Sequence, residues 1–191
     1  MSKKKETIIN TATTLFNREG FHSVGVDKIA AAAGVSKLTL YRNFPSKERL
    51  IIEVLHRCKE DFLNDIRLIT ENQPTPKDKL FSFFNYYHYW FKSVNFRGCM
   101  LSHSVAELGY KSNAIIEMNQ SMKNSLIQIL LTILYPVVKG ERAQRIAYTF
   151  IILVDGSISA ELTWRHQNEY SPALIAWSTA KTILESEGIP L

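Results

Sequence analysis

A single glycine limits how the N-terminal quarter of this chain can fold. Gly34 follows an apolar helical repeat made by Val26, Ile29, Ala30 and Ala33, which predicts a short helix with one buried face. Glycine enters the left-handed conformation without steric cost, so helices commonly end beside such a residue. We therefore expect the chain to turn sharply at Gly34 and to begin a second short helix directly after it.

The segment after the turn has the pattern of a capped helix with two different faces. Ser36 is a good N-cap, and Pro45 should end the helix near Asn43 because the residue before proline avoids the helical region. Leu40 and Phe44 are four residues apart, so they share a face that can pack against the preceding helix. The other face offers groups that bond phosphate oxygens and base edges. The pattern predicts a DNA-binding helix-turn-helix; the alternative is a helical hairpin with a solvated polar face.

The positive charge of the chain is concentrated on the same segment. The formal net charge is +5, and residues 1–50 hold nine Lys or Arg against four Asp or Glu, so residues 51–191 are neutral overall. Such a distribution steers a domain towards polyphosphate. Lys3, Lys4 and Lys5 form a basic arm that is either a solvated tail or a further contact to DNA. The residues expected to contact DNA are Lys28, Ser36, Lys37, Leu38, Thr39, Tyr41, Arg42, Asn43 and Lys47.

Two stretches of this segment resemble a known family. Residues 34–50 read Gly-Val-Ser-Lys-Leu-Thr-Leu-Tyr-Arg-Asn-Phe-Pro-Ser-Lys-Glu-Arg-Leu, which resembles the signature of the TetR (tetracycline-repressor-type) family of bacterial transcriptional regulators. Residues 12–21, Ala-x-x-Leu-Phe-x-x-x-Gly-Phe, resemble the end of the first helix of that family. The resemblance implies that Thr39 and Tyr41 touch DNA and that Lys47 lies near the phosphate backbone.

The chain departs from the family pattern at the start of the second helix. Many members have a hydroxyl residue that bonds a phosphate there, where this chain has Val24 and Gly25. That contact must come from a backbone amide at the helix N-terminus, or it is missing.

Proline and glycine divide the rest of the chain into six further helices. Their expected bounds are about 47–70, 76–93, 101–108, 113–134, 141–165 and 172–188. With three helices in the N-terminal segment, we expect an all-α fold of about nine helices without strands. The expected domains are a DNA-binding helix-turn-helix domain, residues 1–46, and a ligand-binding and dimerisation domain, residues 47–191.

The last two expected helices carry apolar stripes that suit an oligomer interface. A helix that is apolar on two sides is buried on two sides, and the alternative to an interface is burial within one chain. The resemblance implies a four-helix bundle made by two such pairs across a two-fold axis. A dimer of helix-turn-helix heads would then bind a partly palindromic operator. The residues expected in the interface are Phe150, Leu153, Ser157, Ala160, Trp164, Leu174, Trp177, Lys181 and Leu184.

A strongly aromatic segment at residues 81–96 predicts a core, and some of its side chains are candidates to line a cavity instead. A helix with aromatic residues on every side cannot turn all of them to solvent. The resemblance places the pocket for a small-molecule inducer among the helices of residues 76–165. The candidate ligand-binding residues are Phe84, Tyr87, His88, Trp90, Cys99, Met100, His103, Phe150 and Trp164, and ordinary core packing is the alternative for each.

Cys99 is a separate candidate for a sensor. The segment Arg-Gly-Cys-Met-Leu-Ser-His at residues 97–103 resembles a Gly-Cys block in a subset of the family, some members of which respond to electrophiles or oxidants. A thiol ahead of a helix N-terminus, close to Arg97 and one turn from His103, is favoured as a thiolate. The alternative is that Cys99 is a small buried hydrophobe, as free cysteines usually are. Cys58 lies on an expected helix of mixed charge, and we interpret it as unreactive.

Other classes of protein find little support in the sequence. The chain has no phosphate-binding glycine loop, no Gly-x-Ser-x-Gly turn and no paired metal ligands, so we expect no catalytic residue, metal or cofactor, and no enzyme. No apolar run reaches the roughly 18 residues that span a bilayer, so no membrane partner is expected. Two cysteines do not make a disulfide framework, and a cytoplasmic location fits best.

These observations lead to one functional hypothesis and one alternative. We expect a ligand- or redox-responsive transcriptional regulator, in this family most often a repressor, that binds double-stranded operator DNA as a homodimer. A small-molecule inducer or modification of Cys99 would release it. The alternative is a helical dimer that binds DNA without sequence preference, or another protein, and senses no small molecule.

Overall fold

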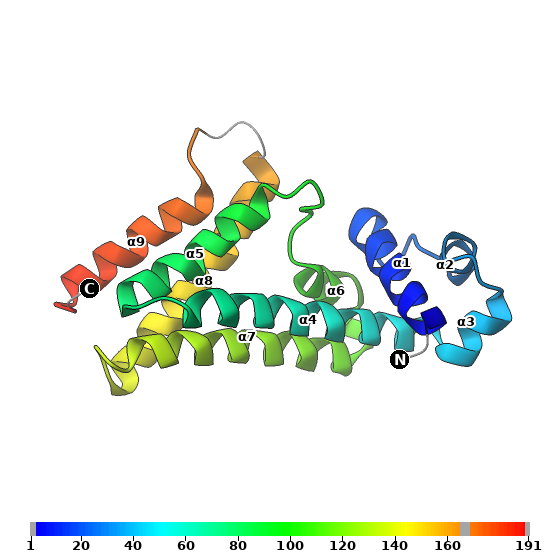
Figure 1. Cartoon of the computed structure of the whole chain (residues 1–191), viewed down its shortest axis with the longest axis horizontal. Coiled ribbons are helices and arrows are strands. Elements are labelled where there is room, and N and C mark those ends of the chain that lie inside the picture. Colours follow the sequence, from blue (N-terminus) through cyan, green and yellow to red (C-terminus); the bar gives the residue numbers. More distant parts are fainter. Residues whose placement is uncertain (1–2, 165–168, 190–191) are drawn as a thin grey trace. The chain divides into compact units, whose positions relative to one another are not determined.

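The computed structural model of the protein describes residues 3–164 and 169–189, and within them it is all-α without strands (Figure 1). The expected fold class is confirmed, and the described ranges hold nine α-helices. These are α1 (Lys3–Glu19), α2 (Val26–Ala32), α3 (Lys37–Asn43), α4 (Lys47–Glu71), α5 (Pro76–Phe91), α6 (Met100–Leu108), α7 (Asn113–Leu134), α8 (Gly140–Trp164) and α9 (Pro172–Ser186). A 3₁₀ turn, η1 (Gly109–Lys111), follows α6. Residue 165, the expected end of the eighth helix, lies outside the described residues.

The chain packs as two compact units. The first consists of Met1–Asp61 and Cys99–Gln120, so the first half of α4, the whole of α6 and η1, and the start of α7 pack with helices α1 to α3. The second consists of Phe62–Gly98 and Ser121–Leu191 and holds the rest of α4 and α7 with α5, α8 and α9. The boundary expected at residue 47 therefore does not follow the packing, and it stays a prediction about how function is divided.

The helix-turn-helix is held by a small apolar core within the first unit. α2 contributes Ile29 and Ala30, and α3 contributes Leu40, as the sequence pattern predicts. Phe44, directly after α3, is also buried. Burial of each large apolar side chain contributes roughly 1.5–3 kcal/mol, which is what keeps helices of seven residues folded. The face of α1 that covers them consists of Ile8, Ile9, Ala12, Leu15 and Phe16.

The turn between α2 and α3 has the expected left-handed glycine. Gly34 has φ of +65°, and its amide donates to the Ala31 carbonyl at 3.2 Å. The Val35 amide donates to the Ala30 carbonyl at 3.0 Å. This pair of bonds closes the end of α2 and fixes the angle at which the chain enters α3.

In the second unit, α5, α8 and α9 pack against one another (Figure 1). Aromatic side chains make part of this contact. The Phe84 ring of α5 lies 5.6 Å from that of Phe150 on α8 and 5.8 Å from Trp177 on α9. An ion pair between Lys123 and Asp155 joins α7 to α8. The aromatic segment thus forms a core between these helices, which is one of the two outcomes that its composition allowed.

Helix α8 is apolar enough on average to count as a candidate membrane span. Over an 18-residue window it has a mean hydropathy of 1.4, and by length and composition it could cross a membrane. The expectation from the sequence concerned unbroken apolar runs, which polar residues and Asp155 interrupt in this helix. A third of the window is buried inside the protein (33%), and helices of protein cores meet the same criterion.

The turn at Gly34 gives a stability prediction. No heavy atom lies within 4 Å of a Cβ built at Gly34, so Gly34→Ala adds only backbone strain. We expect it to lower the free energy of unfolding by about 1 kcal/mol, because L-residues are disfavoured in the left-handed region. Gly34→Asn is the control and should lose less, because asparagine tolerates that region better. Urea denaturation measures both, and equal losses for alanine and asparagine would contradict this reading.

Candidate nucleic-acid interface

Local hydrogen bonds fix both ends of α3. Ser36 takes the N-cap position, and its Oγ accepts a hydrogen bond from the Thr39 amide at 3.1 Å. The Phe44 amide donates to the Leu40 carbonyl at 2.8 Å, and the helix ends at Asn43 before the proline, as expected. A capped helix of two turns, buried on the Leu40 side, presents its other side to solvent in a fixed orientation.

The solvent side of α3 carries large side chains that the core does not use. Leu38 is 61% exposed and Tyr41 is 39% exposed. Lys37 and Arg42 are also exposed. Apolar, phenolic and cationic groups side by side on one short helix suit the thymine methyl groups, base edges and phosphates of a major groove. The structure therefore brings together the central members of the predicted DNA-binding set.

Thr39 and Asn43 contribute to the helix itself. The Thr39 hydroxyl lies 2.9 Å from the Ser36 hydroxyl, at the N-terminal end of α3. The Asn43 side chain donates to the Thr39 carbonyl at 2.8 Å, and both residues are partly exposed. A role in DNA contact stays a prediction for them, and in the free protein their bonds rigidify the helix.

Two of the predicted cations are held by carboxylates on the protein surface. Lys28 pairs with Glu19, and Lys37 lies 2.8 Å from Asp27. The hydrogen bond that Lys37 donates to Asp27 raises the pKa of Lys37, and the bond that Lys28 donates to Glu19 lowers the pKa of Glu19. Exposed ion pairs contribute little net stability, so phosphate oxygens can replace these carboxylates at little cost.

Lys47 occupies a different environment from the one that the resemblance implied. Its ammonium donates to the Phe21 carbonyl at 2.6 Å, in the loop between α1 and α2, and the side chain is partly buried. Burial lowers the pKa of Lys47, opposed by the nearby charge of Glu107. A contact between this ammonium and the phosphate backbone is untested, and in the free protein its bond is to the loop.

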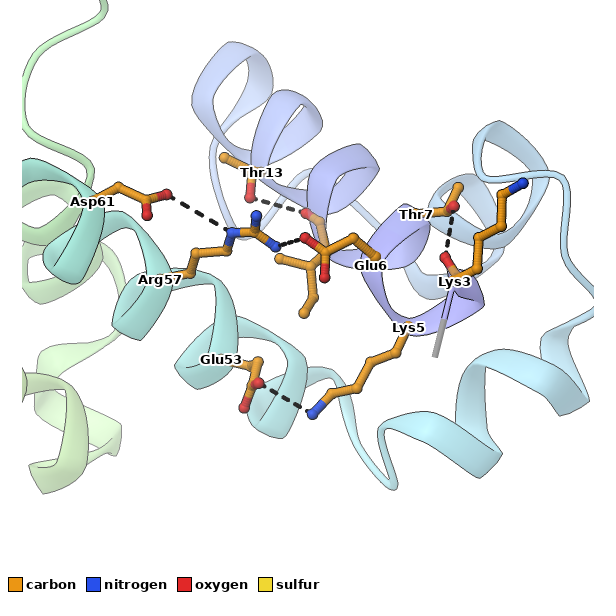
Figure 2. Close-up of polar contacts among 9 residues, drawn as sticks. Lys3, Lys5, Glu6, Thr7, Thr13, Glu53, Arg57 and Asp61 are labelled. Carbon is orange, nitrogen blue, oxygen red and sulfur yellow. Dashed lines mark hydrogen bonds and ion pairs between the residues drawn. The ribbon is translucent and has the colours of Figure 1, made fainter. Parts of the chain in front are cut away.

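The N-terminal lysines belong to α1 rather than to a free arm. Lys5 lies 3.1 Å from Glu53 on α4 (Figure 2). Its ammonium is 5.6 Å from the centre of the Phe44 ring. One residue further on, Glu6 pairs with Arg57 of α4. These contacts clamp the start of α1 onto α4, so Lys5 supports the core beneath α3 instead of extending into solution.

Sequence reasoning missed one residue of this unit altogether. Glu107, in the last turn of α6, accepts hydrogen bonds from the backbone amides of Phe21 and His22 in the α1–α2 loop. The residues are more than eighty positions apart, and no pattern in the sequence links the two segments. Only the fold brings them together.

The candidate ligand-binding residues are divided between the two units. Phe84, Tyr87 and Phe150 are buried in the aromatic core of the second unit, and His88, Trp90 and Trp164 are partly or fully exposed there. Cys99, Met100 and His103 belong to the first unit. The predicted set therefore does not form one described site, and its role in ligand binding stays a prediction.

His88 has a polar partner that the sequence did not indicate. Its Nδ1 lies 2.7 Å from the hydroxyl of Ser171, the residue at the N-cap position of α9. Burial lowers the pKa of His88, helped by Lys92 and opposed by Glu161. The contact joins the last turns of α5 to the start of α9.

The two cysteines lie close to α6 in the first unit. Cys99 takes the N-cap position of α6, is 8% exposed and makes no side-chain cap bond. The Cys58 thiol lies 3.9 Å from the Met100 sulfur, and burial raises the pKa of Cys58 to about 11. The raised pKa agrees with an unreactive Cys58.

Arg97 was expected from the sequence to lie close to the Cys99 thiol. Its guanidinium donates hydrogen bonds to the Val94 and Phe96 carbonyls.

The predicted interface residues do not share one exposed face. Phe150, Ser157 and Leu184 are buried within the chain, so these three are not available to a partner, and the prediction does not hold for them. Trp177 packs against Phe81 and Phe84. Helical periodicity located apolar stripes but not which stripe faces the chain's own core. The remaining members, which are partly or fully exposed, are Leu153, Ala160, Trp164, Leu174 and Lys181.

Comparison with known proteins agrees with the helix-turn-helix geometry of α2 and α3. Residues 8–54 match the family model described as bacterial regulatory proteins, tetR family. The chain is 39% identical over 72 residues to the HTH-type transcriptional regulator RutR of Escherichia coli, covering 38% of this chain and 34% of that protein. It is 36% identical over 69 residues to the negative regulator IcaR of the biofilm operon in Staphylococcus aureus, covering 36% of this chain and 37% of that protein. Each match thus spans about a third of the relative's length.

Solved structures extend the likeness to the fold of almost the whole chain. A TetR-family transcriptional regulator from Streptomyces coelicolor has a TM-score of 0.85 at 22% identity, over 96% of this chain and 95% of that one. At this identity the comparison concerns the fold alone.

Fold and site together define a DNA-binding protein of the helix-turn-helix class. Its N-terminal residues carry the domain of one particular group within that class. That group is the tetR family of bacterial regulatory proteins, whose family model matches residues 8–54, and the fold of almost the whole chain is similar to that of a solved TetR-family regulator.

Proposed function

We propose that this regulator is a dimeric repressor whose two α3 helices enter neighbouring major grooves of a palindromic operator, and that an effector releases it. The observation that carries the proposal is the solvent face of α3, where Leu38, Tyr41 and Arg42 lie together without a role in the core. Repression is supported by the likeness to IcaR, a negative transcriptional regulator to which this chain is 36% identical over 69 residues.

Dimerisation is supported by an exposed apolar surface on α8 and α9. Tyr148 and Ile152 are 56% and 69% exposed and lie four residues apart, and Ile175 on α9 is 53% exposed. Gly156 and Ser159 continue the α8 stripe with side chains small enough for a second helix to approach. Exposed apolar stripes of this kind mark interaction sites, and a second copy of the chain is the occupant that two heads on a symmetric operator require.

The effector in this proposal is either a small molecule or a modifying reagent. The aromatic residues around Phe84, Tyr87 and Trp90 would provide an apolar site for a small molecule, if packing in the second unit adjusts. The alternative route is Cys99. An adduct on this buried thiol would need space beside the first turn of α6, so the modification would displace that helix. A ligand weakens DNA binding only by its differential affinity for two states, typically by about 1–3 kcal/mol.

A helical dimer that binds DNA without sequence preference is the competing function. The charge of the first fifty residues favours any duplex to some degree. Selection of duplexes from a random pool separates the two functions. A regulator should prefer its operator over random duplex by roughly 10³ or more at fixed salt, and architectural binding should show no such gap.

The exposed face of α3 leads to a prediction about contact types. Tyr41→Ala should reduce the preference for the operator over random duplex by about tenfold or more, because a base-edge contact contributes roughly 1–3 kcal/mol of discrimination. Arg42→Ala should weaken binding to every sequence and reduce the salt slope by about one. Fluorescence anisotropy over a range of salt measures both. Tyr89→Ala, an exposed tyrosine of α5, is the control and should change neither quantity. If Arg42→Ala altered only sequence preference, the assignment of contacts would be wrong.

The apolar surface of α8 leads to a prediction about assembly. Ile152→Asp places a charge where two helices would meet, and we expect the dimer to dissociate at least tenfold more readily in sedimentation equilibrium. Leu68→Asp on α4 introduces the same group at a similarly exposed position, 64%, and should leave the dimer intact. Dissociation by both variants, or by neither, would argue against this surface.

The two cysteines allow the thiol route to be tested directly. A quinone should weaken operator binding of the wild-type protein and of Cys58→Ser by about tenfold, and it should have no effect on Cys99→Ser. Cys58 is the matched control because burial disfavours its thiolate. Release of Cys99→Ser by the quinone to the wild-type extent would exclude the thiol route and leave the small molecule as the effector.

A further inference from the structure

The loop between α1 and α2 is held by a carboxylate that comes from α6. A single oxygen of Glu107, Oε2, accepts the Phe21 amide at 2.9 Å and the His22 amide at 3.1 Å. The His22 ring adds a third contact, because its Nε2 lies 2.9 Å from the Glu107 carbonyl, which can only accept. Hydrogen bonds to an ionised acceptor are stronger than neutral ones, so this is a firm attachment for a loop of a few residues.

The opposite side of the same loop is also held. The Lys47 ammonium at the start of α4 donates to the Phe21 carbonyl at 2.6 Å. The Phe21 ring is buried and lies 5.1 Å from the Phe16 ring of α1. The peptide groups on both sides of Phe21 therefore bond to charged side chains, the Glu107 carboxylate of α6 and the Lys47 ammonium of α4.

Gly20 shows how closely the carboxylate fits against the loop. It has φ of +81°, and a Cβ built there would lie 3.1 Å from Oε1 and 3.4 Å from Oε2 of Glu107. The glycine thus permits both the left-handed turn after α1 and the approach of the carboxylate. The position of α6 and the conformation of the loop are fixed by the same contact.

We propose that Glu107 is a positioning residue for DNA binding: it fixes the α1–α2 loop and, through it, the orientation in which α2 and α3 meet DNA. This inference rests on the proposed function. The loop leads through Val24, which is fully buried, directly into α2, and α2 is joined to α3 by the fixed turn at Gly34. A loop without its anchor would let the helix pair adopt several orientations. Affinity for DNA would then fall, because only a small fraction of the molecules would have the orientation that binds DNA.

The role is distinct from a contribution to overall stability. The apolar faces of α1, α2 and α3 form the core of the helix-turn-helix segment, and Glu107 is not part of that core. Two hydrogen bonds at a partly exposed site affect the global free energy of unfolding far less than that core does. The effect of losing them should therefore appear in the loop and in DNA affinity before it appears in thermal unfolding.

The test compares Glu107→Ala with Glu107→Gln in the full-length protein. We expect Glu107→Ala to weaken binding to the selected operator at least tenfold and to speed hydrogen exchange of the Phe21 and His22 amides at least tenfold. Glu107→Gln retains an acceptor oxygen and should recover most of both losses. Thermal unfolding of the three proteins should coincide within a few degrees.

Glu117→Gln provides the control for charge. It removes the same negative charge from an exposed position on α7 in the same unit, and it should leave operator affinity unchanged or slightly higher. Unchanged operator affinity of Glu107→Ala, or unchanged exchange of the two amides, would overturn the role of Glu107. A wild-type protein that prefers no duplex would instead refute the proposed function, and the exchange measurement would still report on the loop.

Discussion

Helix α3 is too short to persist by itself, and this constraint explains most of the first unit. Helices of seven residues are unstable in water, so α3 exists only because one side of it is buried. Leu40 forms that buried side, and its neighbours Thr39 and Tyr41 remain partly or fully exposed. The caps, the glycine turn and the ion pairs between α1 and α4 all serve to hold a two-turn helix against a core while its outer face stays free. This arrangement gives α3 a rigid solvent-exposed face that contributes nothing to the core.

The parts of the fold that the sequence predicted are those that depend on neighbouring residues. Gly34, Ser36 and Leu40 act within one or two turns, so their spacing was enough to define the turn, the cap and the buried face. The nine helices within residues 3–164 and 169–189 also followed from the positions of proline and glycine. The solvent face of α3 could be predicted as well, because a residue that is not on the buried side of a surface helix must be exposed.

The parts that the sequence did not predict depend on contacts between distant segments. Periodicity showed that α8 is apolar on more than one side, but it could not tell which side meets α5 and α9 of the same chain. Phe150 was therefore assigned to a partner although it packs on Phe84. The bond from the Lys47 ammonium to a loop carbonyl had no local signal either, and the expected contact of Lys47 with phosphate stays a prediction. Glu107 had no signal at all, since an acid in a helix of mixed composition is usually just solvated.

The length of α6 gives the anchor of the α1–α2 loop a mechanical sensitivity. Cys99 stands at one end of this nine-residue helix and Glu107 lies in its last turn. At a rise of about 1.5 Å per residue the two are about 12 Å apart, so a tilt of about 5° at the first end moves the other by about 1 Å. A hydrogen bond of 2.9 Å stretched by that amount no longer counts as one. A small tilt of α6 at Cys99 would therefore break both hydrogen bonds that Glu107 accepts from the loop amides.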